Sequence, residues 1–229
     1  MTHRFKQNIS DVNGKIAAAA AKAGRTADEV TLVGVTKYVD AAVTREFAEA
    51  GHLVLGENRP QQLWQKQEEL ADLGVEWHLI GHLQRNKAKR MVQVATLIHS
   101  VDSLRLLKAI DGFAAEQHKL ARVLLEVNVS GEEAKHGFTP EQLPSIVEAA
   151  AEFQSTEVTG LMAMAGLAGD RDDARREFAL LRSLAQKTAE TGLPANVKMK
   201  DLSMGMSGDF EIAIQEGATI VRVGSALFK

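Results

Sequence analysis

The chain of 229 residues contains no cysteine. This absence excludes disulfides, thiolate catalysis and zinc sites built on cysteine, and it is compatible with a reducing compartment. Aromatic residues make up only 5% of the chain, and Tyr38 is its one tyrosine. No apolar run is long enough to span a bilayer, and the N-terminal residues lack the apolar core of a signal peptide. We therefore expect a cytoplasmic protein.

An excess of charge of one sign is also lacking, because 27 basic residues face 30 acidic ones and the formal net charge is −3. This balance argues against a general nucleic-acid binder and against a membrane-surface binder. Proline is scarce, and no stretch rich in proline, glycine or serine divides the chain. A hydrophobic content of 45% is ordinary for a globular protein with a core. Residues 1–229 are therefore expected to form a single domain.

Apolar, β-branched runs alternate with helical patterns along the chain. The expected strands are Val30–Thr36, His52–Leu55, Trp77–Ile80, Leu97–Val101, Arg122–Val129, Val158–Met164, Asp201–Ser203 and Thr219–Val223. The expected helices are Ala41–Ala50, Pro60–Leu73, Asn86–Ala95, Leu104–Gln117, Pro140–Phe153, Ala174–Thr191 and Asp209–Gln215. Strict alternation predicts a parallel sheet, and about eight strands fit a closed α/β barrel of the (β/α)8 TIM type better than an open sheet. A doubly wound sheet would place a glycine-rich turn after the first strand, whereas Thr36–Asp40 contains no glycine.

An extra helix is expected before the first strand. Phe5, Ile9, Val12 and Ile16 are spaced by four, three and four residues, which places them on one helical face, and Gly24 ends the pattern. The chain stops just after the eighth expected strand, so this N-terminal helix is expected to fill the place of a final one.

Two loops near the C-terminus carry the strongest chemical signal. Leu202–Asp209 and Ala218–Ser225 each read as a strand followed by a loop of small residues. Glycine and serine leave backbone N–H groups open to an anion, and a helix N-terminus attracts the same charge. Loops after the seventh and eighth strands of a barrel frequently form a phosphate site. The pattern therefore predicts a phosphorylated ligand.

Lys37 ends the first expected strand, on the same face as Val33 and Val35. From position alone, a surface lysine is the simpler interpretation. Barrel closure pairs the eighth strand with the first, however, and so brings both loops and the inward-facing Arg222 beside Lys37. A lysine shielded from water can attack carbonyls. A lysine, an arginine and a phosphate site together describe a pyridoxal 5′-phosphate (PLP) site, in which the lysine forms the Schiff base.

Several motifs, in order along almost the whole chain, resemble one family. The chain is similar to the pyridoxal phosphate homeostasis proteins, which resemble the barrel domain of alanine racemase without its second domain. The segments that carry the resemblance are Val33–Tyr38, Gly56–Asn58, Trp77–Lys87, His99–Asp102, Asn128–Glu132, Gly160–Met162 and Leu202–Phe228.

The resemblance implies a role for each candidate site residue. Lys37 would carry PLP as an aldimine, and Arg222 would face the ring or the phosphate. An arginine at the pyridine nitrogen disfavours protonation there, which suits a carrier more than a transaminase. The remaining candidates would hold the phosphate or line the pocket: Ser207, Gly208, Gly224 and Ser225 for the phosphate, Asn58 and His78 for the pocket, and Met204, which with Met206 brackets the phosphate loop.

The chain departs from the family pattern at two places. Ala134 stands where the family is expected to have a hydroxyl residue, which puts a site role there in doubt. The chain ends Leu227-Phe-Lys229, where the family usually continues through a glycine and a short tail, so a truncated C-terminus stays open.

Three further features are given simpler interpretations. His78 and His82 are four residues apart, but at a strand end this spacing does not favour a shared metal, and no metal site is expected. Arg85, Lys87, Lys89 and Arg90 form a basic run that is better explained as a solvated helix face than as a partner surface. Tyr38 follows Lys37 on a strand and is expected to point to the opposite face.

We therefore expect a PLP-binding barrel that acts in vitamin B6 and amino-acid homeostasis without robust catalysis. Its expected partners are PLP and apoenzymes that need PLP, and it is expected to be a monomer or a weak dimer. A weak PLP-dependent racemase or lyase is the alternative, although the chain lacks the second domain that supplies the second base. A phosphosugar-handling barrel that uses the same loops is a third hypothesis.

Overall fold

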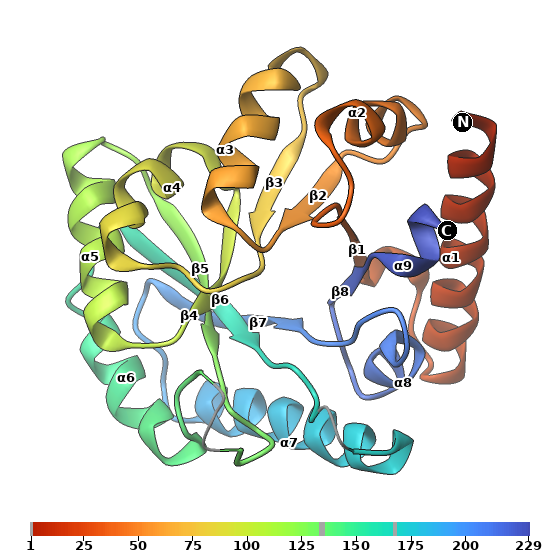
Figure 1. The fold of residues 1–229 in the computed structure, drawn as a ribbon. Coiled ribbons are helices and arrows are strands. Elements are labelled where there is room, and N and C mark those ends of the chain that lie inside the picture. Colours follow the sequence, from red (N-terminus) through yellow and green to blue (C-terminus); the bar gives the residue numbers. More distant parts are fainter. Residues whose placement is uncertain (1, 133–135, 167–168) are drawn as a thin grey trace.

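The computed structural model describes residues 2–132, 136–166 and 169–229, so Ala134 lies outside the described residues. Eight parallel strands close into a barrel in chain order, with β8 paired to β1 (Figure 1). The predicted (β/α)8 fold is therefore confirmed. The strands are β1 (Thr31–Val35), β2 (Val54–Glu57), β3 (Glu76–Leu79), β4 (Leu97–Val101), β5 (Ala121–Glu126), β6 (Thr156–Met162), β7 (Val197–Ser203) and β8 (Ile220–Val223).

Helices surround the barrel. They are α1 (Thr2–Lys22), α2 (Ala41–Glu49), α3 (Pro60–Glu69), α4 (Ala88–Val94), α5 (Leu104–Glu116), α6 (Leu143–Ala150), α7 (Arg171–Glu190), α8 (Phe210–Gln215) and α9 (Ser225–Phe228). Short 3₁₀ turns are η1 (Ala27–Glu29), η2 (Ala71–Leu73), η3 (Arg85–Lys87) and η4 (Pro140–Gln142). The predicted helix Pro60–Leu73 therefore breaks into α3 and η2, and α7 begins earlier than predicted because the Asp170 carboxylate accepts from the N–H groups of Asp172 and Asp173.

The strand ends differ from the prediction where it matters for the site. β1 ends at Val35 rather than Thr36, so Lys37 lies in the turn that follows the strand. β2 lies two residues later than predicted, and its Gly56 pairs with Val35 of β1. Asn58 therefore follows directly after a strand at the C-terminal end of the barrel.

The N-terminal helix takes the position of an eighth barrel helix, as predicted. α1 packs against α2, α8 and α9, and both chain ends lie beside it (Figure 1). The buried Phe5 contacts Phe47 of α2 and Phe228 of α9 edge-on, with ring centroids 5.6 Å and 5.8 Å away. The side-chain amide of Asn8 donates to the carbonyl of Leu227 at 2.9 Å. α1 thus fixes the short helix that follows β8.

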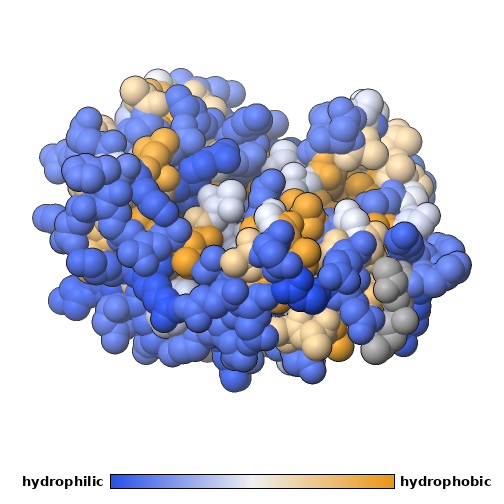
Figure 2. Space-filling model, turned by 90° about the horizontal axis from the view of Figure 1, so that it is seen from above, coloured by the Kyte–Doolittle hydropathy of each residue, from blue (hydrophilic) through white to orange (hydrophobic). Residues whose placement is uncertain are grey.

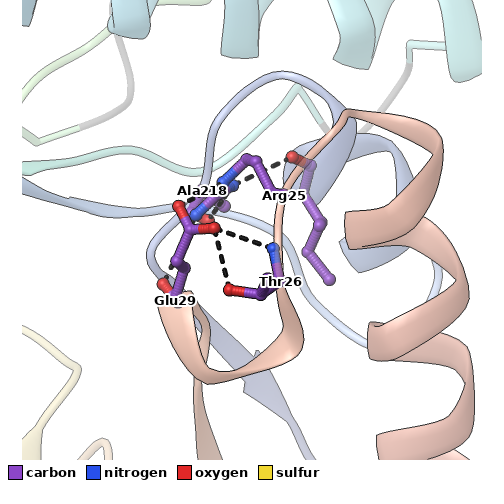
Figure 3. A network of polar contacts seen from close by, with 5 residues as sticks. Arg25, Thr26, Glu29 and Ala218 are labelled. Carbon is purple, nitrogen blue, oxygen red and sulfur yellow. Dashed lines mark hydrogen bonds and ion pairs between the residues drawn. The ribbon is translucent and has the colours of Figure 1, made fainter.

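A polar network connects the segment that follows α1 to the turn before β8 (Figure 3). The Arg25 guanidinium donates to the carbonyls of Ala218 at 2.8 Å and Ile214 at 3.2 Å. The Glu29 carboxylate accepts from the backbone N–H of Thr26 at 2.7 Å and from its hydroxyl at 3.0 Å. These contacts hold the first strand beside the last one, where the barrel closes.

Two apolar layers make up the core. The larger lies between strands and helices, and a small cluster fills the barrel: Val33, Leu97, Leu124, Met162 and Ile220. The face drawn in Figure 2 is mostly hydrophilic, and many of its apolar residues lie near the middle of the view. Within the described ranges, no helix combines the length and apolarity needed to cross a membrane.

Candidate functional site

A cavity of about 660 Å³ opens at the C-terminal end of the barrel strands. It takes residues from β1, β2, β3, β6, β7 and β8 or from the loops that follow them. Seven of the nine sequence-predicted site residues line it: Lys37, Asn58, Ser207, Gly208, Arg222, Gly224 and Ser225. Barrel closure therefore brings the predicted lysine and both predicted loops to one cavity, of a volume that suits a small-molecule ligand.

Lys37 reaches the cavity from a turn. The backbone N–H of Val39 donates to the Thr36 carbonyl at 3.1 Å, which closes a turn with Lys37 and Tyr38 at its centre. The prediction that Tyr38 points away from Lys37 is wrong, because the strand alternation ends at Val35. Tyr38 is 89% exposed, lines the cavity mouth, and places its ring 4.9 Å from the Lys37 Nζ.

The loops after β7 and β8 form one structure, which we call the cup: residues 205–209 together with Gly224 and Ser225. The Ser207 hydroxyl accepts from the Gly224 N–H at 3.1 Å and so joins the loops. The Asp209 carboxylate accepts from the Met206 N–H at 2.5 Å. Gly205 has a φ of +91°, and a Cβ there would lie 2.5 Å from that of Ala213, so the loop requires glycine.

Backbone donors of the cup remain available to a ligand. Within the described part of the chain, the N–H groups of Ser207, Gly208 and Ser225 donate to no protein acceptor. All three residues line the cavity. Backbone N–H groups without acceptors on several residues that line one cavity suit an anion such as phosphate.

Arg222 places a buried positive charge beneath the cavity. Its side chain points into the barrel, as predicted, where its guanidinium donates to the Ser203 hydroxyl at 2.5 Å and to the Ala163 carbonyl at 3.0 Å. Burial lowers its pKa to about 10, against opposing effects of Asp209 and Glu126, so the group is charged at neutral pH. A donor held in this way can face an electron-rich ring atom or a phosphate oxygen.

The structure does not bring His78, predicted to line the pocket, to this cavity. Its position in β3 places it in the barrel interior, below Ile80 and Gly81, which line the cavity instead. His78 belongs to an interior chain of side chains that starts at Arg222. His99 Nδ1 lies 2.8 Å from the Ser203 hydroxyl, and His99 Nε2 lies 2.9 Å from His78 Nδ1.

One direction in the interior chain is fixed, because the Arg222 guanidinium only donates and the Ser203 hydroxyl accepts from it. The directions of the Ser203–His99 and His99–His78 hydrogen bonds depend on the tautomer of each imidazole ring. Burial lowers the pKa of His78 to about 4 and holds that of His99 well below its usual value, so both rings are neutral. The interior chain therefore orients Arg222 without adding charge.

Met204 is also not brought to the cavity. It is fully buried between the barrel and its helices, and Met206 lines the cavity in its place. Sequence reasoning missed Ile80, Gly81 and Lys229 among the lining residues. At position 81 the glycine itself is a signal in the sequence, because glycine is typical of a close backbone approach. A Cβ there would lie 2.2 Å from the Asn58 carbonyl oxygen.

A second group of titratable residues lies on the other side of the barrel end. His82 Nδ1 is 3.0 Å and His136 Nδ1 is 3.8 Å from Asp102 Oδ2, and the two imidazole rings stack with centroids 4.6 Å apart. His82 therefore pairs with Asp102 and not with His78. Nearby, burial and the Asp102 charge raise the pKa of Glu126 to about 7.

The basic run is partly neutralised on the surface. Lys89 pairs with Glu116 at 2.9 Å, Arg90 pairs with Glu68, and the guanidinium of Arg90 also lies 4.7 Å from the Trp64 ring centroid. These contacts favour the interpretation of a solvated helix face.

Residues 3–229 match the model of the family described as "Alanine racemase, N-terminal domain". The chain is 43% identical over 222 residues to the pyridoxal phosphate homeostasis protein of Aquifex aeolicus, with 97% of this chain and 96% of that protein covered. It is 40% identical to the protein of that name from Pseudomonas aeruginosa, with 97% and 94% covered. The chain belongs to the pyridoxal phosphate homeostasis protein family.

Solved structures agree with this assignment. PipY of Synechococcus elongatus, solved with PLP bound, is 35% identical and superposes with a TM-score of 0.83 over 93% of this chain and 100% of that one. Alanine racemase from Corynebacterium glutamicum is 17% identical, with a TM-score of 0.69 over 95% of this chain and 60% of that one. The second likeness shows the barrel fold alone.

Proposed function

We propose that this protein binds PLP at the cavity and serves PLP homeostasis as a carrier. The observation that carries the proposal is that Lys37 lines the same cavity of about 660 Å³ as three residues whose backbone N–H groups have no acceptor among the described residues. PLP supplies an aldehyde that reacts with a lysine amine and a phosphate that needs converging donors. The homeostasis proteins of two bacteria at 40% identity or more, and PipY with PLP bound, support the same cofactor.

The proposal gives each side chain a task. Lys37 bonds covalently to the cofactor, and the cup residues Ser207, Gly208, Gly224 and Ser225 hold its phosphate. Arg222 faces the ring from the barrel interior, and Asn58 lines the same cavity. A positively charged arginine opposes protonation of a pyridine nitrogen, which restrains the ring as an electron sink. This restraint suits storage or delivery of PLP to apoenzymes by a cytoplasmic, single-domain protein.

Tyr38 supports the carrier role over a racemase. A two-base racemase needs a second base across the substrate from the lysine, whereas the Tyr38 ring lies beside the Lys37 amine. We expect no exchange of the α-proton of amino acids when the loaded protein is incubated in deuterated water. Exchange at a rate typical of enzymes would contradict the carrier role and favour a racemase.

An absorbance titration tests the proposed function. The wild-type protein mixed with PLP is expected to develop the visible band of a lysine-bound cofactor, and Lys37→Ala is expected to lack it. Lys229→Ala is the matched control, because Lys229 also lines the cavity. A wild-type protein that stays colourless would favour a phosphosugar ligand, and an unchanged band in Lys37→Ala would exclude Lys37 as the attachment site.

A further inference from the structure

A buried ion pair lies directly beneath the turn that carries Lys37. Glu57, the last residue of β2, is fully buried, and Lys66 of α3 is 5% exposed. Lys66 Nζ lies 2.5 Å from Glu57 Oε1. Neither residue lines the cavity, so the pair does not contact a ligand there.

Both members of the pair bind Thr36, the residue before Lys37. The Thr36 hydroxyl donates to Glu57 Oε1 at 2.7 Å, and Lys66 Nζ donates to the Thr36 carbonyl at 2.8 Å. That carbonyl is the acceptor that closes the turn with the Val39 N–H. Thr36 is itself fully buried, and its N–H donates to the Gly56 carbonyl at 3.0 Å. The pair therefore fixes the first residue of the turn at its backbone and its side chain.

Stability of the fold is a poor explanation for these two charges. Desolvation of a buried ion pair commonly cancels its Coulomb attraction, and apolar residues of similar size often serve stability as well. Glu57 uses one oxygen for both contacts, and its buried Oε2 has no hydrogen-bond partner among the described residues. Such a costly arrangement is better explained by the position that it imposes.

We propose that Glu57 and Lys66 are positioning residues that hold the Lys37 amine where it meets the cofactor aldehyde, with which it condenses to a C=N bond as the aldehyde oxygen and two protons leave as water. This inference rests on the proposed function. Bond formation at a single atom is sensitive to displacement, and an error of about 1 Å can reduce a reaction about a hundredfold. Phosphate binding at the cup depends on other loops. The pair therefore affects the covalent capture of the cofactor by Lys37 and leaves the affinity of the cup for the phosphate unchanged.

Two ligands separate these effects. PLP bonds covalently to Lys37 in addition to its contacts with the cup and the rest of the cavity, whereas pyridoxine 5′-phosphate carries a hydroxymethyl group in place of the aldehyde and makes the same contacts without the covalent bond. In Lys66→Met, we expect the rate of covalent capture and the affinity for PLP to fall by about tenfold to a hundredfold. The affinity for pyridoxine 5′-phosphate is expected to stay within about twofold of the wild type, because no Lys37 bond contributes to it.

Two further variants keep the test decisive. Lys66→Met leaves a buried unpaired carboxylate, so Glu57→Gln combined with Lys66→Met removes both charges at similar volume and is expected to fold while keeping the capture defect. Lys89→Met breaks the exposed pair with Glu116 and is expected to match the wild type with both ligands.

The outcomes distinguish this inference from the proposed function. A wild-type protein without covalent capture would overturn the proposed function and this inference with it. Wild-type capture together with equal losses for both ligands in the folded double variant would show that the pair serves only the fold. Wild-type capture with no loss in either variant would overturn the positioning role as well.

Discussion

The two sides of the cavity hold their chemical groups by different means. On the lysine side, the buried charges of Glu57 and Lys66 hold the turn that carries Lys37 and so fix the position of one amine. The cup offers backbone N–H groups to the cavity, and its shape depends on glycine and on short side-chain contacts. A covalent bond needs one atom in one place, whereas a phosphate needs several small donors around it.

The largest expected effect comes from the glycine that shapes the cup. Gly205→Ala forces an L-residue to a φ of +91° and brings its Cβ within 2.5 Å of that of Ala213. We expect a loss of about 2–5 kcal/mol in unfolding free energy from the strain and the overlap. Affinity for pyridoxine 5′-phosphate should fall too. Urea unfolding measures the change in stability, and ligand titration measures the change in affinity.

Gly208→Ala is the matched control for the cup. No atom lies within 4 Å of a Cβ at Gly208, and its φ carries no left-handed strain. Its unfolding free energy is expected to stay within about 0.5 kcal/mol of the wild type. Equal losses in the two variants would contradict a cup that is shaped by Gly205.

The next effect concerns Glu126, whose carboxyl faces both Asp102 and Arg222. Its pKa rises on folding from 4.5 to about 7, chiefly because of burial. The folded state therefore holds a proton that the unfolded chain releases, and this contribution to stability is lost as the pH rises from about 4.5 through 7. The Glu126→Gln variant has no ionisable group at this position, so its stability does not fall with pH for this reason.

The expected gain of Glu126→Gln over the wild type therefore grows with pH. Between pH 4.5 and pH 8 the difference in unfolding free energy should change by about 2–4 kcal/mol in favour of the variant. Glu116→Gln, on the exposed surface, should show no comparable change. A difference that stays constant across this range would mean that Glu126 is ionised in the folded protein at all these pH values.

Ser203 tests the interior chain that orients Arg222. Ser203→Ala removes the hydroxyl between Arg222 and His99, so two buried polar groups lose this hydrogen-bond partner. We expect a loss of about 1–3 kcal/mol in unfolding free energy. Ser145→Ala, whose exposed hydroxyl donates to the Gln142 carbonyl, should cost much less. Equal losses would show that the chain does not support Arg222.

The smallest effect is expected at the contact between the two loops of the cup. Ser207→Ala removes the acceptor of the Gly224 N–H and should cost about 0.5–1.5 kcal/mol in unfolding free energy. The freed N–H lies at the cavity, so the affinity for inorganic phosphate should change by less than about tenfold. A larger fall in affinity would mean that the hydroxyl itself binds the phosphate strongly.

The sequence predicted the fold and most of the cavity, because strand alternation and barrel closure decide which strand ends meet. Lys37, Arg222 and both loops followed from that rule. His78 and Met204 do not line the cavity, since strand parity shows which way a side chain points but not the layer it occupies. The Glu57–Lys66 pair could not be predicted, because it depends on how α3 is rotated against β2. The predicted direction of the Tyr38 side chain was wrong because β1 ends at Val35, so the strand alternation does not reach Lys37 and Tyr38.

The most direct test of the account is to locate the covalent bond to the cofactor. The protein is loaded with PLP, reduced with borohydride so that the bond becomes permanent, digested and analysed by mass spectrometry. Both Lys37 and Lys229 line the cavity, so either could capture the aldehyde. The account predicts the pyridoxyl group on Lys37. A modification confined to Lys229, or the absence of any specific adduct, would contradict it.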